Sequence, residues 1–207
     1  IYVNYLCGGK IMNPLKSIPM TVGLGFVLAI IISLSYGDGN PALNMWSLMT
    51  WLHVFFGIVW IGLLYYFNFV QVPGVATALA DKDGPGPSAI NKYIAPNALF
   101  YFRWGALLTW ITGAAALHYS GIGIHQAFAL QSGVEVIGIG AWLGTIMLFN
   151  VWGLIWPNQK RILGIVKATD AQIAKGKVVA LMASRTNTLL SIPMLMCMSS
   201  HMHGLPL

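Results

Sequence analysis

Charged residues and cysteines are scarce in this chain, and both shortages limit what it can be. Only 8% of its 207 residues are Asp, Glu, Lys or Arg, whereas 57% are hydrophobic. Water-soluble domains carry about 25% charged residues. A soluble fold of this length could not bury so much apolar surface, so we expect the lipid bilayer to be its solvent. Cys7 and Cys197 form neither C-x-x-C nor C-x-x-C-H, which excludes a redox dithiol and a c-type haem attachment of those kinds.

Long apolar stretches replace the missing charges. A helix needs about 20 apolar residues to cross the hydrocarbon core. Five stretches meet or nearly meet this length, so we predict an all-α integral membrane protein, a single transmembrane domain over residues 1–207. Pro157 should close the fourth span, and Pro193 should be tolerated inside the fifth. We expect the spans at about 18–36, 46–71, 98–119, 136–156 and 187–202.

The segments between the spans are predicted as connections. We expect loops at 37–45, 72–97 and 120–135. The stretch 158–186 carries Thr169-Asp170 ahead of an apolar pattern. It should form either a helix on the cytoplasmic surface or a downward extension of the fifth span.

Lys and Arg are missing from one side of these spans, and that absence orients the chain. All eleven Lys and Arg residues fall on one side and all five His on the other. By the positive-inside rule the basic side is cytoplasmic, which places the N-terminus inside and the C-terminus outside. The net charge of +6 is therefore interpreted as a topology signal and a contact with anionic lipid, not as a nucleic-acid site.

The histidines are the candidate ligands, because ionisable groups inside spans are rare and usually functional. His53 lies within the second span, His118 in the last turn of the third, and His201 at the end of the fifth. We predict these three as metal ligands. His125 is interpreted as a loop residue and His203 as a solvated or structural one.

Small residues beside these histidines favour a flat cofactor. Gly57 and Trp60 share a helix face with His53, and Ala114 lies in the small-residue turn before His118. A porphyrin needs a ligand histidine and a neighbouring turn without bulk, and facing helices of a bundle are its usual site. We therefore predict haem b, with His53 as one axial ligand. The alternative is that small residues only allow close helix packing, as we expect for Gly140-x-x-x-Gly144.

Copper is a second possible cofactor. The sequence His201-Met202-His203 offers imidazole and thioether ligands, which suit copper. In a helix, side chains two residues apart point about 200° apart. His201 and His203 could bind one ion only if the end of the helix unwinds, so haem fits better.

Polar residues also gather where the spans meet the cytoplasmic interface. Arg103 and its neighbours could bind a substrate or haem propionates. Alternatively, they form interhelical hydrogen bonds, helix caps and interface anchors. The set comprises Asn68, Gln71, Arg103, Asn150, residues 156–160 and residues 184–187.

Three motifs resemble the urate oxidase N-terminal domain family, the membrane portion of bacterial membrane-bound urate-oxidising proteins. The motifs are residues 51–71, 149–159 and 184–194, and the resemblance extends over about 46–203. It implies the bacterial inner membrane as the location. Family members implicated in urate oxidation carry a C-terminal cytochrome c domain. This sequence contains no C-x-x-C-H, so we expect it to lack that electron acceptor.

Together these features predict an electron-transfer protein that binds haem b near the extracytoplasmic face. It would pass electrons to a periplasmic cytochrome c or within a larger respiratory or photosynthetic complex. Two alternatives stay open: a membrane-bound urate or purine oxidase that uses an external cytochrome c, and a cofactor-free accessory subunit. The sequence names no catalytic residue, so enzymatic activity is left open.

Overall fold

The computed structural model describes residues 13–37, 39 and 43–206, and within them every regular element is a helix. Cys7, Lys10 and Asp38 lie outside the described residues. The chain divides into two compact units, residues 1–43 and 44–207, and each is described by itself. We call the second unit the bundle.

The first unit contains one long apolar helix. A short 3-10 helix, η1 (Pro14–Lys16), precedes α1 (Ile18–Tyr36). The Asn13 side chain caps η1 by accepting a hydrogen bond from the Leu15 backbone N–H at 3.0 Å. None of the 19 residues of α1 is buried within the structure. The helix coincides with the first predicted span.

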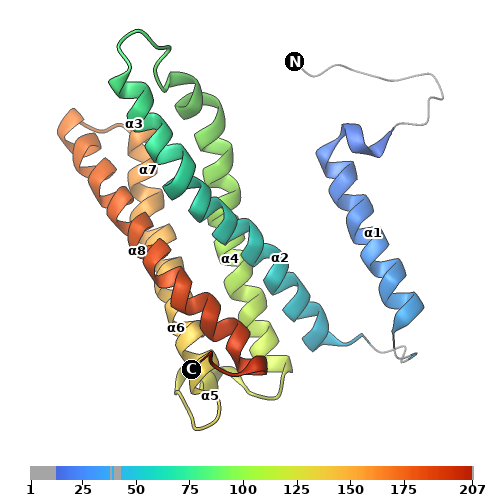
Figure 1. The fold of residues 1–207 in the computed structure, drawn as a ribbon. Helices are drawn as coiled ribbons and strands as arrows, with labels where there is room; N and C mark the ends of the chain where they lie inside the picture. The colour runs from blue at the N-terminus through green and yellow to red at the C-terminus, as the bar shows by residue number, and fades with distance from the viewer. Residues whose placement is uncertain (1–12, 38, 40–42, 207) are drawn as a thin grey trace. The chain divides into compact units, whose positions relative to one another are not determined.

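The bundle is built from long helical rods that alternate in direction (Figure 1). The first rod joins α2 (Met45–Tyr65), η2 (Tyr66–Gln71) and α3 (Val72–Ala80). The second joins η3 (Ile90–Ile94) and α4 (Ala95–Tyr119). The third joins α6 (Glu135–Phe149), η4 (Asn150–Ile155) and α7 (Trp156–Ile162). The fourth is α8 (Asp170–His203), and the short α5 (Ile124–Phe128) lies between α4 and α6.

Prolines explain why three of these rods contain a π-helical segment. Among the described residues η2, η3 and η4 are π-helical, and each ends two residues before a proline: Pro73, Pro96 and Pro157. Proline lacks an N–H, and its ring clashes with the carbonyl of residue i−4. A wider turn relieves that clash. The residue before each proline accordingly donates its N–H five residues back, as Trp156 does to the Val151 carbonyl.

Two predicted boundaries are therefore wrong. Pro157 does not close the fourth span, because the π-helical turn lets the helix continue to Ile162. The predicted loop 72–97 is mostly helical, since α3 continues the second span to Ala80 and helix resumes at Ser88. Pro193 does lie inside α8, as predicted.

The helix α8 resolves the choice left open for residues 158–186. It starts at Asp170 and runs without a break into the fifth span, so the extension forms. A capping box fixes its start: the Thr169 hydroxyl accepts from the Gln172 N–H at 3.3 Å, and the Gln172 side chain accepts from the Thr169 N–H at 2.9 Å.

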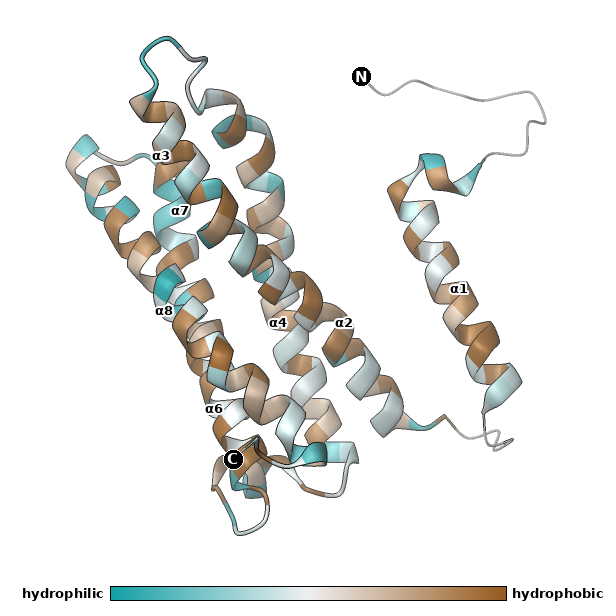
Figure 2. Cartoon of the chain, viewed as in Figure 1, coloured by the Kyte–Doolittle hydropathy of each residue, from teal (hydrophilic) through white to brown (hydrophobic). Residues whose placement is uncertain are grey.

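The core of the bundle lies where all the rods meet. The helix α2 packs mainly against α4, and α6 packs mainly against α8. Large apolar side chains remain outside that core, among them Ile58 (69% exposed) and Ile192 (66% exposed). Figure 2 shows that hydrophobic residues recur along the length of the rods. Such a surface is compatible with contact to lipid. The buried side chains include Trp60, Leu64, Phe102, Met147, Val151 and Met194.

Length and composition allow four helical stretches of the described chain to cross a membrane. They are Ile18–Tyr36, Met45–Ala80, Glu135–Ile162 and Asp170–His203. The remaining predicted span, α4, is 25 residues long and is not among them. Its polar Asn97 and Arg103 lower its hydropathy. The five-span count and its orientation thus stay predictions.

Candidate functional site

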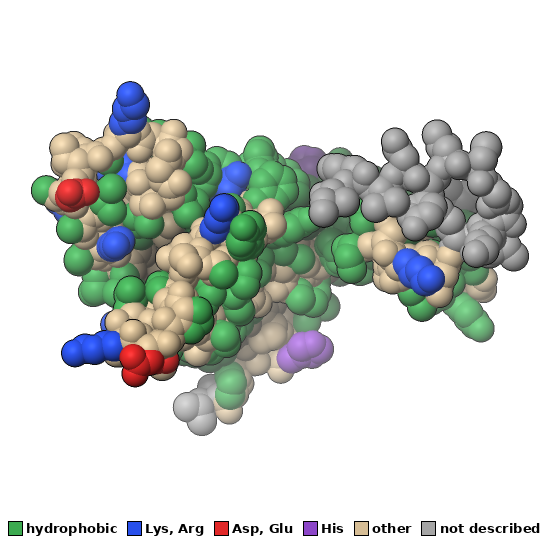
Figure 3. Space-filling view, turned by 90° about the horizontal axis from the view of Figure 1, so that it is seen from above, with side chains coloured by type: hydrophobic (Ala, Val, Ile, Leu, Met, Phe, Trp, Pro, Cys, Tyr) green, Lys and Arg blue, Asp and Glu red, His purple; other side chains and the backbone are tan. Residues whose placement is uncertain are grey.

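The fold separates basic residues from histidines along the bundle. The end of α4, α5 and the end of α8 carry four of the five histidines, and we call this the histidine end. The opposite end comprises residues 81–87, α7 and the start of α8, and we call it the basic end. Seen from above, the basic end presents Lys and Arg side chains beside acidic ones (Figure 3). The charge sorting predicted from the sequence is thus reproduced within the bundle.

His53 is tied to the backbone of α4. It lies about two turns inside α2, and its Nδ1 is 2.7 Å from the Thr109 carbonyl oxygen. A Cβ on Gly113 would approach His53 Nδ1 and Cε1 to 2.7 Å. The imidazole therefore lies against α4 in the space that Gly113 leaves. The side chain is half-buried.

This contact selects one tautomer of His53. A carbonyl oxygen can only accept a hydrogen bond, so Nδ1 must carry the proton and Nε2 keeps its lone pair. Histidines that bind metals commonly have this arrangement, with the second ring nitrogen donating to a backbone carbonyl. The same bond also joins α2 to α4, so the arrangement serves helix packing as well.

Gly57 and Trp60 lie on the face of α2 that packs against α4. A Cβ on Gly57 would meet only Thr109 Cγ2, at 3.8 Å. A Cβ on Gly105 would lie 3.4 Å from the Trp60 backbone nitrogen, so Gly105 permits the close approach of the two helices. The indole of Trp60 is 2% exposed, and its Nε1 has no hydrogen-bond partner among the described residues. Helix packing thus occupies the face that the sequence associated with a porphyrin.

The other predicted cofactor residues divide between the two ends of α4. Ala114 follows Gly113 in α4 and is half-buried. Arg103 lies six residues before Thr109, which is about 9 Å along a helix axis. Its guanidinium is stacked over the Trp156 ring at 3.9 Å. The structure thus places Gly113, the residue before Ala114, against His53 and places Arg103 in a separate contact with α7.

The other candidate ligands lie at the histidine end without forming a cluster. His118 is exposed and meets Tyr119 edge-on at 5.0 Å between ring centroids, whereas His201 is half-buried. No three His, Cys, Asp or Glu side chains come together as a metal site in the part of the chain that the structure describes. The helix α8 stays helical through His203, so His201 and His203 point in different directions.

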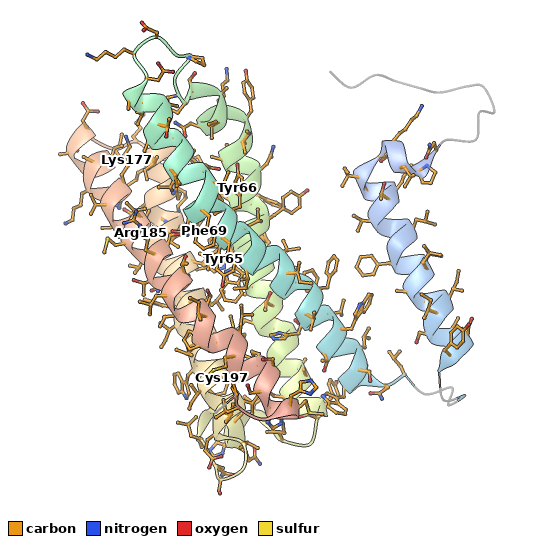
Figure 4. The ribbon with its side chains drawn as sticks, in the orientation of Figure 1. Tyr65, Tyr66, Phe69, Lys177, Arg185 and Cys197 are labelled. Atoms are coloured by element: carbon orange, nitrogen blue, oxygen red, sulfur yellow. The ribbon has the colours of Figure 1, made fainter. Side chains whose placement is uncertain are left out.

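Gly140 confirms the packing motif predicted in the fourth span only in part. A Cβ on Gly140 would lie 3.1 Å from Cys197 Cβ, so this glycine allows α6 to approach α8. Gly144 is buried, but a Cβ there would meet no atom within 4 Å. Figure 4 labels Cys197 in the half of α8 near the histidine end.

A cavity of about 440 Å³ lies at the basic end of the bundle, partly open to the surface. Ligand clefts commonly measure about 300–1,000 Å³. Its walls come from all of the rods and are mostly aliphatic and aromatic. Figure 4 labels Lys177, one of its polar residues, toward the basic end of α8. The polar residues in the wall are Gln71, Asn91, Gln159, Lys177 and Ser184.

The π-helical segments supply part of this cavity wall. Phe67 and Gln71 come from η2, Asn91 from η3 and Ile155 from η4. Single-turn π segments inside α-helices occur frequently at functional sites. The sequence does contain a signal for these segments. Each wide turn ends two residues before a proline inside a helix, namely Pro73, Pro96 or Pro157.

The polar residues predicted at the cytoplasmic interface have two different roles. Asn150 and Asn187 form a buried network, in which Asn150 Nδ2 donates to Asn187 Oδ1 at 2.8 Å and Asn187 Nδ2 donates to the Met147 carbonyl at 2.9 Å. These bonds match the second interpretation of this polar set, in which its members form hydrogen bonds between helices.

The second group borders the cavity. Asn68 Nδ2 donates to the Leu64 carbonyl at 2.9 Å and to Ser184 Oγ at 2.8 Å. Gln71 Oε1 is buried and has no hydrogen-bond partner among the residues described. An unpaired buried acceptor costs about 1–3 kcal/mol, so it marks a place where a donor is missing.

Fold and composition together define the class of this protein: a helical protein with segments able to cross a membrane. The family model described as urate oxidase N-terminal matches residues 117–205. This match confirms the sequence resemblance over that part of the chain, which includes the motifs at 149–159 and 184–194. The motif at 51–71, with His53, lies outside it. No curated protein and no solved structure matches the chain.

Proposed function

We propose that this chain is a membrane electron-transfer protein that binds haem b, with His53 as one axial ligand. The observation that carries the proposal is the 2.7 Å contact of His53 Nδ1 with the Thr109 carbonyl. It holds the ring in a fixed orientation and leaves Nε2 able to bind iron. The urate oxidase N-terminal match covers residues 117–205, outside His53, and supports a redox role for the chain.

The membrane arrangement is part of the proposal. The four apolar stretches and α4 would all cross the inner membrane of a bacterium, with the basic end in the cytoplasm. With the basic end in the cytoplasm, the opposite, histidine end lies outside. An odd number of spans then places the N-terminus inside and the C-terminus outside. Electrons would be exchanged there with a periplasmic cytochrome c or with neighbouring subunits of a larger respiratory or photosynthetic complex.

The residues of the chain would hold and shield the group. Gly113 provides space for the His53 ring. The buried Trp60 and the half-buried Ala114 would contribute apolar surface that excludes water from a bound group. When bound, haem supplies one-electron transfer at a potential set by burial and hydrogen bonding.

An optical spectrum of the purified chain tests the proposal. We expect a Soret band, a reduced b-type spectrum and a positive pyridine-haemochrome assay. His53→Ala should abolish the signal, whereas His125→Ala, at an exposed position in α5, should retain it. A well-folded protein without a Soret band would overturn the proposal in favour of a cofactor-free accessory subunit.

A second histidine, His118 or His201, would hold the haem together with His53. His201 is on a different helix from the residues that contact His53, as in bundles whose facing helices supply the ligands. His118→Ala and His201→Ala should therefore behave differently. The replacement that converts a low-spin to a high-spin spectrum identifies the ligand.

The family match supports a second candidate, a component of membrane-bound urate or purine oxidation with an external cytochrome c as acceptor. Membranes that contain the chain would then reduce added cytochrome c when urate is supplied. The His53→Ala variant is the control. Absence of urate-dependent reduction by membranes that show an intact Soret band would leave the electron-transfer role without this substrate.

A further inference from the structure

We propose that the cavity at the basic end binds the ring of a lipid-soluble quinol or quinone. The choice of a redox-active ligand rests on the proposed electron-transfer function. The shape and polarity of the cavity do not depend on that function. The proposal concerns binding and assigns no reaction step to the cavity.

The lining of the cavity suits a mainly apolar molecule. Most of its wall is aliphatic or aromatic, and Phe67, Leu99 and Phe102 form part of the buried core beside it. Its volume of about 440 Å³ can hold a substituted six-membered ring. The exposed Leu79 lies in its wall. A ligand that carries a long apolar tail could therefore place its ring inside and its tail along the lipid-facing surface.

The polar groups of the cavity can pair with a ligand that carries both a hydrogen-bond donor and an acceptor. Gln71 Oε1 is a buried acceptor that has no partner among the described residues. Ser184 Oγ already accepts from Asn68 at 2.8 Å, so its own O–H is free to donate. Lys177 adds three N–H donors at the wall. A quinol hydroxyl can donate to Gln71, and a quinone carbonyl can accept from Ser184 or Lys177.

Other ligands satisfy fewer of these requirements. A fatty acid carboxylate could pair with Lys177 but offers no donor to Gln71 Oε1. Urate offers donors and acceptors around its whole ring, whereas the cavity has few polar groups to meet them. Each unmet polar group would cost affinity. A quinol matches the apolar wall and also offers a donor to Gln71 Oε1, which has no partner among the residues that the structure describes.

The binding experiment uses the purified full chain in detergent, without oxygen. A decyl-substituted benzoquinone and its quinol are the probes, and equilibrium dialysis gives the dissociation constants. We expect saturable binding of both forms, with the quinol held more tightly. Oleate and urate are tested as competitors, and neither should displace the quinol at comparable concentration.

Two variants separate the roles of the polar groups. Gln71→Leu removes the acceptor for a hydroxyl, so it should weaken quinol binding about tenfold and quinone binding about twofold or less. Lys177→Met removes an N–H donor to the quinone carbonyl, so it should weaken the binding of the quinone more than that of the quinol. The matched controls are Gln131→Leu and Lys175→Met, whose exposed positions do not line the cavity. They should leave both constants unchanged.

The two proposals fail separately. Quinol binding by the His53→Ala variant should persist, because that histidine is not part of the cavity wall. A missing Soret band therefore bears only on the haem proposal. The cavity proposal is overturned if neither probe binds saturably, if Gln71→Leu and Lys177→Met change neither constant, or if oleate or urate displaces the quinol.

Discussion

From His53 to Trp60, α2 packs closely on α4 through small residues, whereas at the basic end the rods surround a cavity. Gly105 and Gly113 allow the close contact, and the His53 ring occupies the space that Gly113 leaves. At the basic end, the wall of the 440 Å³ cavity includes residues of η2, η3 and η4. The first rod, which contains α2, and the second, which contains α4, take part in both arrangements.

The difference shows two ways in which an apolar bundle can build a site. Glycine brings one helix close enough for an imidazole to reach the backbone of another. Proline within a helix widens the preceding turn and redirects the side chains on it. Each region contains a buried polar atom without a hydrogen-bond partner among the described residues: the Trp60 Nε1 donor between α2 and α4, and the Gln71 Oε1 acceptor beside the cavity. The buried amide of Asn187, by contrast, has hydrogen-bond partners.

The largest effect is expected at Gly113. Gly113→Ala would place a methyl group 2.7 Å from the His53 ring, so the ring must move and its bond to Thr109 should break. Overpacking of this kind costs about 1–3 kcal/mol, and we expect about 2–3 kcal/mol less free energy of unfolding in detergent. Gly62→Ala is the control, because a Cβ there meets nothing within 4 Å. It should be neutral or up to about 1 kcal/mol stabilising. Equal losses in both variants would contradict the close-packed interface.

Asn187→Leu should have the next largest effect. Asn187 is completely buried, and its side-chain oxygen accepts a hydrogen bond from Asn150. Replacing it by leucine leaves the Asn150 amide without that acceptor. We expect a loss of about 2 kcal/mol in the free energy of unfolding. The double variant with Asn150→Leu should recover part of that loss, since no unpaired partner remains. Additive losses in this double-mutant cycle would show that the two amides do not interact.

Pro157→Ala tests whether proline widens the basic end. The alanine restores a backbone donor and removes the ring, so η4 should revert toward an α-helix. We expect about 1 kcal/mol of stabilisation and weaker quinol binding, because the wall at Ile155 would move. Pro193→Ala makes the same change in α8, away from the cavity. It should affect stability without affecting quinol affinity. An equal loss of affinity in the two variants would contradict the idea that the π-helical turn before Pro157 shapes the cavity.

The smallest effect is expected for Gln71→Leu in the absence of ligand. Removing a buried acceptor that has no partner should cost nothing and should raise the free energy of unfolding by about 0.5 kcal/mol. The sign is opposite to that for Asn187→Leu. Thermal unfolding of both variants in the same detergent checks the contrast. Destabilisation by Gln71→Leu would mean that its side chain is paired in the free protein.

The sequence predicted some helix positions well and others poorly. Apolar runs located α1 and the centres of the other rods, because a span must be apolar along its whole length. Predicted ends failed just before Pro73 and at Pro157, and only Pro157 was interpreted as a stop. Neither proline ends its helix, because a π-helical turn absorbs the clash. The local sequence alone does not say whether a helix will break or widen at proline.

The candidate sites were only partly predictable for a related reason. His53, Gly57 and Trp60 were placed on one face of α2 by helical spacing. The partner of that face was not, since Thr109 is 56 residues away. The spans are apolar on all sides, so periodicity does not indicate how each helix is rotated toward its neighbours. The cavity was missed because its wall combines residues from every rod of the bundle.

The sequence by itself determined that the chain is helical and apolar, and that its Lys and Arg residues are separated from its histidines. These properties depend on composition along the chain and need no knowledge of contacts. Only the tertiary structure decided that His53 donates to the α4 backbone, that Gly113 makes room for it, and that Gln71 faces a cavity without a partner. Those facts depend on the rotation and register of packed helices, which close contacts between distant residues establish.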